Sequence, residues 1–276
     1  MRILVVGGRQ TDAGKTTMTL GLRHALDAVA VKPRAANNYW YDYDTVHRTV
    51  TDGGDLVGAD AEKLAKSNPT GWSNPAEINP LHRLWQPVDS STETILGEPG
   101  REFVLDRLGT EYILNETADI PDILGTHLDL GDARSIAELS KFNALMRDQY
   151  LPFLDSFATE VSSLDSLIIE SYGDVALPIH GLTVDVVVSV HPGRIAIYEG
   201  RRFLDACRVS SRSPREGRME PIVSDITTMV DPVATESIPP LRSRTRASPG
   251  NIRRAYSDAI SAIERAVSAC PESDRR

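Results

Sequence analysis

The stretch Arg2–Thr17, RILVVGGRQTDAGKTT, decides the fold class of this chain. It begins with an apolar run, Arg2–Val6, which predicts a buried strand that the glycines Gly7 and Gly8 end. The spacing of apolar residues over Thr16–Asp27 then predicts a helix. The stretch therefore reads as a strand, a glycine-rich turn and a helix.

A second strand is predicted directly after the helix, at Val29–Val31, and Pro33 stops it. A strand, a turn, a helix and a further strand within about thirty residues form a βαβ unit, which requires parallel strands. We therefore expect an α/β fold built as a doubly wound, mostly parallel sheet, of the P-loop NTPase type. No repeat or clean boundary divides the chain, so one domain over 1–276 is expected.

The turn between the first strand and the first helix has the composition of a phosphate-binding loop. Backbone amides of such a loop converge on phosphate oxygens, and the start of the helix adds partial positive charge. Lys15 would bridge the β- and γ-phosphates, and the Thr16 hydroxyl would ligate Mg²⁺. The first glycine, Gly8, stands one residue earlier than in the usual pattern, and Gln10 replaces the extra lysine of partitioning ATPases. The expected nucleotide contacts are Gly8, Thr11, Asp12, Ala13, Gly14, Lys15, Thr16 and Thr17.

With this glycine spacing, the chain resembles the dethiobiotin synthetase family. The likeness continues in order along residues 1–190, through Lys32-Pro33, Asp60–Leu64 (DAEKL), Asn79-Pro80 and Glu170–Asp174 (ESYGD). The segment Asp52–Gly58 (DGGDLVG) is similar to one in the ATP-binding domain of cobyric acid synthase. Both relatives activate a carboxyl or carbamate group by phosphoryl transfer from ATP, and the resemblance also implies a homodimer.

The resemblance implies roles for further charged residues. Asp60 and Glu170 would be the acidic partners of Mg²⁺, with Asp52 and Asp55 as rival candidates. Lys32 would reach the γ-phosphate or the group in transfer and stabilise its charge as a catalytic residue beside Lys15. Independently of any relative, Glu170 ends an apolar run at the carboxyl edge of the predicted sheet, where ligands bind in open α/β sheets.

Three departures from these families affect the expected substrate and base. Ala36 stands where a substrate-binding serine is expected, and Ser171-Tyr172 replaces a pair of small residues after the metal glutamate. His191 follows the later strand Val184–Val190 in place of an adenine-reading asparagine. The acceptor therefore stays open, and so does the choice between ATP and GTP.

Composition excludes several other classes of protein. The net charge of −9 argues against a nucleic-acid partner, because phosphate backbones require clustered Lys and Arg. No apolar run approaches a membrane span and no leader opens the chain, so a cytoplasmic protein without a membrane partner is expected. Two cysteines, Cys207 and Cys270, exclude a disulfide framework and a four-cysteine zinc site, and both are expected to be buried and inert.

The remaining chain is predicted more coarsely. Residues 34–58 are expected to form a long loop, whose aromatic part, Asn37–Asp44, either walls a substrate pocket or packs over the surface. Short strands are expected over 81–115, and 194–209 fits either a hairpin or a strand and a helix. Ser248-Pro249 predicts the start of a helix that runs to about residue 269. The role of residues 200–248 stays open.

Together these patterns predict a Mg²⁺-dependent P-loop ATPase. Its expected reaction is phosphoryl transfer that activates a carboxyl group of a small-molecule acceptor, as in a ligase. The alternative is a nucleotide-gated switch or accessory NTPase that acts on a protein partner. A small-molecule kinase is a third option.

Overall fold

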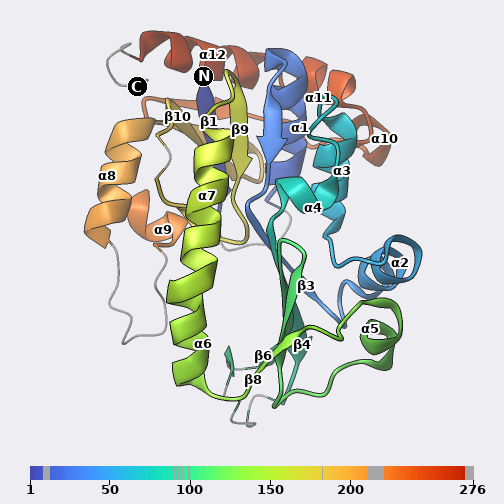
Figure 1. The fold of residues 1–276 in the computed structure, drawn as a ribbon. Helices are drawn as coiled ribbons and strands as arrows, with labels where there is room; N and C mark the ends of the chain where they lie inside the picture. Colours follow the sequence, from blue (N-terminus) through green and yellow to red (C-terminus); the bar gives the residue numbers. More distant parts are fainter. Residues whose placement is uncertain are drawn as a thin grey trace. The chain divides into compact units, whose positions relative to one another are not determined.

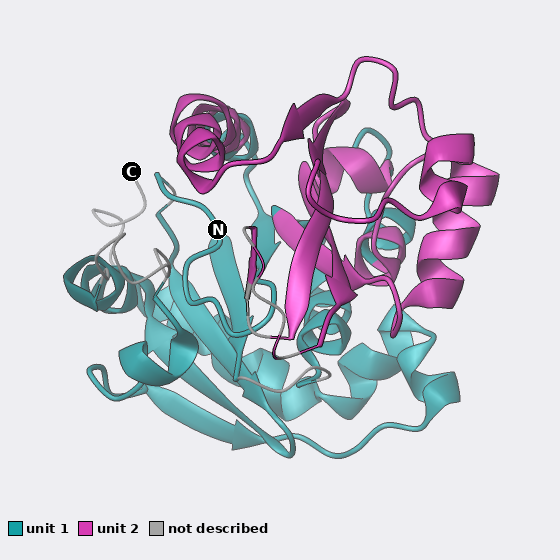
Figure 2. Ribbon diagram, turned by 90° about the horizontal axis from the view of Figure 1, so that it is seen from below, with its two compact units in different colours: residues 1–33, 64–73, 158–276 teal, residues 34–63, 74–157 magenta. Residues whose placement is uncertain are grey.

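The structure is a computed structural model that describes residues 1–8, 13–89, 91, 94, 96–98, 100–181, 183–210 and 221–270. Contacts within the chain divide it into two compact units, coloured separately in Figure 2. Unit 1 comprises Met1–Pro33, Leu64–Ser73 and Ala158–Arg276, and unit 2 comprises Arg34–Lys63 and Asn74–Phe157. Each unit contains a six-stranded sheet (Figure 1). The α/β class is confirmed, whereas the sequence gives no sign of the division into two units.

The sheet of unit 1 has the strand order β12-β11-β10-β1-β9-β2. Its strands are β1 (Arg2–Gly7), β2 (Val29–Val31), β9 (Leu167–Glu170), β10 (Val186–His191), β11 (Arg194–Glu199) and β12 (Ala234–Ser237). The four strands β10, β1, β9 and β2 are parallel, while β11 and β12 are antiparallel additions. The sheet is therefore mixed: four of its six strands are parallel, as expected of a mostly parallel sheet, and it is not purely parallel.

The length of one connection explains why β11 is antiparallel to β10. β10 ends at His191 and β11 begins at Arg194, so only Pro192 and Gly193 join the two strands. A parallel neighbour requires a long crossover connection, whereas two residues suffice for an antiparallel hairpin. The central strands β1 and β10 are buried at nearly every residue, as expected for strands covered on both faces.

Helices of unit 1 pack against this sheet and against each other. α1 (Lys15–Leu26) contacts β1, β2 and β9, and it also packs on α11 (Pro249–Ala255). α12 (Ser257–Ala269) lies against β10, β11 and β12, while α8 (Gly200–Ser210) contacts β10 and β11. The helix expected after Ser248-Pro249 is thus two helices, separated at Tyr256, and 194–209 is a strand followed by a helix. Two short helices, α9 (Val223–Ile226) and α10 (Ser243–Arg246), complete the described part of the unit.

One side chain closes the free edge of β2. Asn68 accepts a hydrogen bond from the Ala30 amide at 2.9 Å and donates one to the Ala30 carbonyl at 2.8 Å. β2 is the last strand of its sheet, so these two backbone groups would otherwise face outward. The carboxamide of Asn68 therefore replaces a neighbouring strand at this position.

The sheet of unit 2 has the order β3-β4-β6-β7-β8, with β5 paired to β6. Its strands are β3 (Arg34–Asn38), β4 (Leu81–Pro87), β5 (Gly97–Glu98), β6 (Arg101–Leu108), β7 (Glu111–Asn115) and β8 (Arg134–Ile136). β3 pairs with β4 and β7 with β8 in parallel, and the other pairs are antiparallel. The short strands expected over 81–115 are confirmed.

Helices of unit 2 include α2 (Tyr43–Gly53), α4 (Pro75–Ile78), α5 (Asp122–His127) and α6 (Leu139–Leu145), which a π-helical turn, Met146–Tyr150, continues. α3 (Ala59–Ser67) and α7 (Leu151–Val161) contribute residues to both units. None of the helices in the described part of the chain has the length and apolar character needed to cross a bilayer.

The prediction of a long loop over 34–58 is wrong, because the segment contains β3 and α2. Val46 and Val50 of α2 are fully buried and pack with Leu56, Leu84 and Val104 in one apolar cluster. Of the aromatic residues between β3 and α2, Tyr39 packs against this cluster, whereas Trp40 is 73% and Tyr41 80% exposed.

Candidate phosphate-binding site

Four sequence-predicted residues meet at one edge of the sheet of unit 1. The parallel strands β1, β2 and β9 end at this edge, so the residues that follow them are neighbours. β1 leads through Gly7 toward Gly14 and Lys15, while Lys32 directly follows β2. Glu170 is the last residue of β9 and lies opposite Val5 of β1. Topology alone therefore brings the loop lysine, the second lysine and the carboxylate to the same place.

Glu170 is the centre of this cluster. Its carboxylate is fully buried, and its Oε1 accepts hydrogen bonds from the Thr16 hydroxyl at 2.7 Å and from the Lys32 ammonium at 2.8 Å. The Lys32 side chain is 8% exposed, so the two residues form a buried ion pair. The other oxygen, Oε2, is buried and has no hydrogen-bond partner among the described residues. Burying a carboxylate oxygen without a partner is costly, so this atom is ready to bind a cation or a donor.

The loop lysine is bonded to the segment that follows β9. Lys15 is 9% exposed, and its ammonium donates to the carbonyl oxygen of Gly173 at 2.8 Å. This contact could not be predicted from the sequence, because a backbone carbonyl has no signature in the amino-acid sequence. The only available signal is the position of Gly173, three residues after Glu170.

Two glycines shape the backbone at the start of α1. Gly14 is the residue before the helix and has a φ of +94°, a conformation that side chains with a Cβ rarely adopt. Gly7 lies close to the lysine stem, because a Cβ at Gly7 would lie 3.1 Å from two carbons of Lys15. Since Gly14 has no side chain to cap the helix, the first amides of α1 are left for an acceptor from outside the helix.

The other predicted loop residues have different outcomes. Ala13 is buried, and Gly8 and Thr17 are partly exposed beside it. Thr11 and Asp12 lie outside the described residues. The contacts with phosphate expected for these five residues stay predictions.

His191 lies against the first glycine of the loop. Gly7 pairs with Val190, so His191 at the end of β10 stands next to Gly8, and a Cβ at Gly8 would lie 3.6 Å from the histidine Nδ1. The buried Ser189 hydroxyl is 3.0 Å from the other ring nitrogen and fixes the ring. Burial and the nearby Arg194 guanidinium lower the pKa of His191, so the ring favours its neutral form.

The donor set at Glu170 fits a hard divalent cation. Mg²⁺ prefers oxygen ligands in an octahedron and retains several waters, so one carboxylate and one hydroxyl suffice. No group of three His, Cys, Asp or Glu side chains suited to a metal occurs among the described residues.

The remaining acidic candidates belong to unit 2. Asp60 lies in the first turn of α3, with its carboxylate 3.7 Å from the Lys63 ammonium. Asp52 accepts a hydrogen bond from the Thr51 hydroxyl at 3.1 Å. Neither contact tests a role in metal binding, so the roles proposed for Asp60 and Asp52 stay predictions.

Asp55 belongs to a polar cluster within unit 2. It accepts a hydrogen bond from the Tyr112 hydroxyl at 3.0 Å and lies 3.2 Å from Nε of Arg107, whose side chain is 1% exposed. The same guanidinium donates to the carbonyls of Leu56 and Asn79 at 2.8 and 2.7 Å. Burial raises the pKa of Tyr112, and the Asp55 charge raises it further. These contacts give Asp55 a structural role, because they join the segment after α2 to strands β6 and β7.

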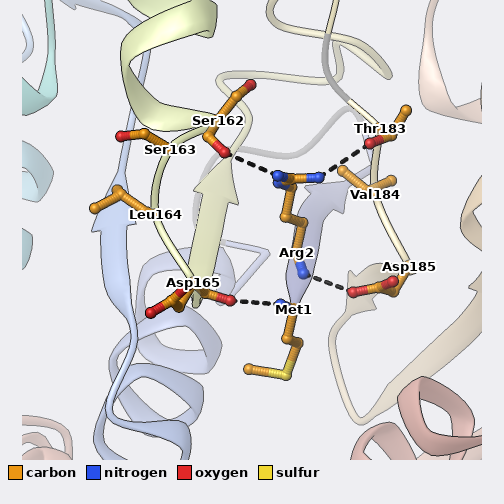
Figure 3. A pocket seen from close by; sticks show the side chains of 9 residues that line it. All are labelled: Met1, Arg2, Ser162, Ser163, Leu164, Asp165, Thr183, Val184 and Asp185. Carbon is orange, nitrogen blue, oxygen red and sulfur yellow. Dashed lines mark hydrogen bonds between the residues drawn. The ribbon is translucent and has the colours of Figure 1, made fainter. Parts of the chain in front are cut away.

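A polar pocket lies at the other end of β1, near the amino ends of the parallel strands. It has a volume of about 230 Å³ and is lined by Met1, Arg2, Ser162–Asp165 and Thr183–Asp185 (Figure 3). The Arg2 guanidinium donates to the Ser162 carbonyl at 2.8 Å and to the Thr183 hydroxyl at 3.2 Å. These bonds tie segments distant in sequence to the start of β1, which is a structural role.

Compared with models of protein families, with curated proteins and with solved structures, the chain has no match. Any function for it therefore depends on the geometry of the residues themselves and on the motifs described above.

Proposed function

We propose that unit 1 has a P-loop NTPase fold and binds a Mg²⁺–nucleoside triphosphate at the cluster formed by Lys15, Thr16, Lys32 and Glu170. One observation supports this most: two side chains from the predicted phosphate loop and from the end of β2 converge on one buried carboxylate. The free Oε2 of the same carboxylate suits a metal cation. A chance Gly-Lys-Thr sequence would not require its threonine to meet a carboxylate buried at the end of a neighbouring strand.

Each residue has a distinct task in this proposal. The amides at the start of α1 and the Lys15 ammonium bind phosphate oxygens, and Thr16 with Glu170 holds the metal. When bound, Mg²⁺ neutralises charge on the phosphates. Lys32 fixes Glu170 and adds positive charge near the reacting group, so catalysis depends mainly on positioning and charge neutralisation.

The proposed reaction is phosphoryl transfer to a carboxyl group of a small molecule, or hydrolysis in its absence. This follows from the motif resemblance to dethiobiotin synthetase and cobyric acid synthase. The base stays open between adenine and guanine, because His191 occupies the expected place of the adenine-reading residue. A homodimer is proposed on the same grounds, and a cytoplasmic location because no apolar run in the sequence approaches the length of a membrane span.

A nucleotide-gated switch is the second candidate. The contact between Lys15 and Gly173 favours it, because it connects the phosphate loop to a segment outside the loop. The two candidates differ in what stimulates turnover. Phosphate release that depends on a small carboxylic acid indicates a ligase-like enzyme, whereas release that depends on a protein indicates a switch.

The first experiment measures binding of Mg·ATP and Mg·GTP by calorimetry and by the shift of the unfolding midpoint. Wild type is compared with Lys15→Ala, and Lys141→Ala is the matched control, since Lys141 is 69% exposed on α6. We expect binding by wild type and by the control and a loss of at least tenfold in affinity for Lys15→Ala, since charge-assisted bonds are the stronger ones. Equal binding by all three proteins would remove the phosphate loop from the proposal.

A further inference from the structure

We propose that residues 171–176, the segment after β9, sense whether the phosphate loop holds a nucleotide and relay this state to residues 221–226 through the contact between Gly173 and Lys15. This inference depends on the proposed nucleotide site and adds a regulatory element to it.

The sensing contact is the hydrogen bond from the Lys15 ammonium to the Gly173 carbonyl, at 2.8 Å. Thr16, the next residue of the loop, is bonded to Glu170 at 2.7 Å, so neighbouring side chains of the loop are both held by the stretch 170–173. A triphosphate presents full negative charges, which bind an ammonium more strongly than a neutral carbonyl does. A nucleotide in the loop therefore competes with Gly173 for Lys15.

The segment itself folds as a compact turn, so a shift at Gly173 is transmitted along it. The buried Ser171 hydroxyl donates to the Val175 carbonyl at 2.5 Å, and the Val175 amide donates to the Tyr172 carbonyl at 3.2 Å. The Ser171 amide donates to the Val5 carbonyl at 2.9 Å, which anchors the start of the turn to β1. Motion is therefore directed toward the far end of the turn.

That far end is paired with the segment that begins α9. The Ala176 amide donates to the Pro221 carbonyl and the Val223 amide donates to the Asp174 carbonyl, each at 2.8 Å. Val175 and Ile222 form an isolated antiparallel bridge between these bonds.

α9 then carries the signal to its neighbour. Val223 and Ile226 of α9 are buried at 1% and 0% exposure, and α9 packs against α8 (Figure 1). A displacement of the turn at 173–176 must therefore alter the pairing with 221–223 and the packing of α9. This gives the relay a structural path composed only of direct contacts.

Hydrogen exchange at the Ala176 and Val223 amides tests the relay, because each amide is a donor in the pairing. Exchange is measured by mass spectrometry for wild type alone, with Mg·ADP and with a slowly hydrolysed Mg·ATP analogue. We expect the triphosphate to speed exchange at both amides by about tenfold, which corresponds to one hydrogen bond to a charged group. The Ser171 amide, which is anchored to β1, serves as the internal control.

Lys15→Met removes the sensing contact and keeps the length of the side chain. We expect both amides to exchange rapidly in this variant whether or not nucleotide is added, while Lys141→Met behaves as wild type. Slow exchange at the two amides in Lys15→Met, measured without nucleotide, would overturn the relay. A wild type that binds nucleotide in the thermal-shift assay but shows unchanged exchange would also overturn it, and would leave the proposed function intact. Absence of any nucleotide binding would instead contradict the proposed function.

Discussion

Lys32 and Glu170 form a buried ion pair, with 2.8 Å between the ammonium nitrogen and Oε1. The carboxylate is fully buried and the lysine side chain is 8% exposed, so neither charge is stabilised by bulk water. Loss of one partner from such a pair typically costs about 3–5 kcal/mol, because the other charge is left uncompensated. The pair therefore links the stability of unit 1 to its candidate site.

Replacing Lys32 by Met should lower the free energy of unfolding by about 3–5 kcal/mol. Glu170→Gln should lower it less, because the amide still accepts hydrogen bonds. The double variant Lys32→Met/Glu170→Leu, which buries neither charge, should be more stable than Lys32→Met alone. Urea titration of the three variants measures these differences, and a double variant no more stable than Lys32→Met would contradict the pair as described.

Gly14→Ala should weaken nucleotide binding strongly and leave the fold intact. The φ of +94° at this position costs a residue with a Cβ about 1–2 kcal/mol, so the backbone before α1 shifts to relieve the strain. We expect an affinity loss of at least tenfold in calorimetry, with circular dichroism unchanged. Gly53→Ala, where no atom lies within 4 Å of the added Cβ, is the matched control. Normal nucleotide affinity in Gly14→Ala would show that this conformation is not required for binding.

Asp55→Asn should affect stability and leave metal dependence unchanged. The Asp55 carboxylate pairs with Arg107 and accepts a hydrogen bond from the Tyr112 hydroxyl. Removing its charge should lower the free energy of unfolding by about 1–3 kcal/mol. Arg107→Met should cost more, because the carbonyls of Leu56 and Asn79 lose their donor. Chemical unfolding measures both losses. A changed Mg²⁺ concentration for half-maximal nucleotide binding in Asp55→Asn would instead identify Asp55 as a metal ligand.

His191 should make unit 1 less stable in mild acid. Its pKa in the folded protein is lowered by burial and by Arg194, so the unfolded chain binds the proton more readily. The contribution of neutral His191 to stability is therefore fully present above the ordinary histidine pKa of about 6.5 and is lost as pH falls below that value. Nuclear magnetic resonance should show a titration midpoint for His191 under 6.5. In His191→Gln the slope of stability against pH between 7 and 5 should be smaller than in wild type.

Cys207 should resist alkylation in the folded protein. Burial raises the pKa of its thiol to about 12, so almost no thiolate is present at pH 8. Iodoacetamide should modify the partly exposed Cys270 about a hundredfold faster, as followed by peptide mass spectrometry. Both cysteines should react in 6 M guanidinium, to about the same extent. Equal rates in native buffer would mean that Cys207 is accessible and unshifted.

In unit 1, the sequence predicts the strands that are fully buried, because such strands consist of continuous runs of apolar residues. β2 has the predicted bounds and β9 ends at Glu170 as expected, since Val29–Val31 and Leu167–Ile169 are buried apolar runs. β3, in contrast, contains Ala and Asn and forms through backbone pairing with β4, which no side-chain pattern announces. The fold class and the short strands over 81–115 were therefore predictable, whereas β3 and the division into two units were not.

The candidate site divides in the same way. Lys15, Thr16, Lys32 and Glu170 could be identified because each stands at a strand or helix end whose position follows from the chain order. Gly173 could not, because its carbonyl acts through a turn whose shape depends on the pairing with residues 221–223.

The carboxamide of Asn68, bonded to both backbone groups of Ala30, has a consequence for assembly. A sheet that runs continuously from one subunit into the next needs an edge with unsatisfied amides, and this side of the unit 1 sheet offers none at Ala30. The opposite border of the sheet is β12, which pairs with β11 alone and alternates between half-buried and exposed residues.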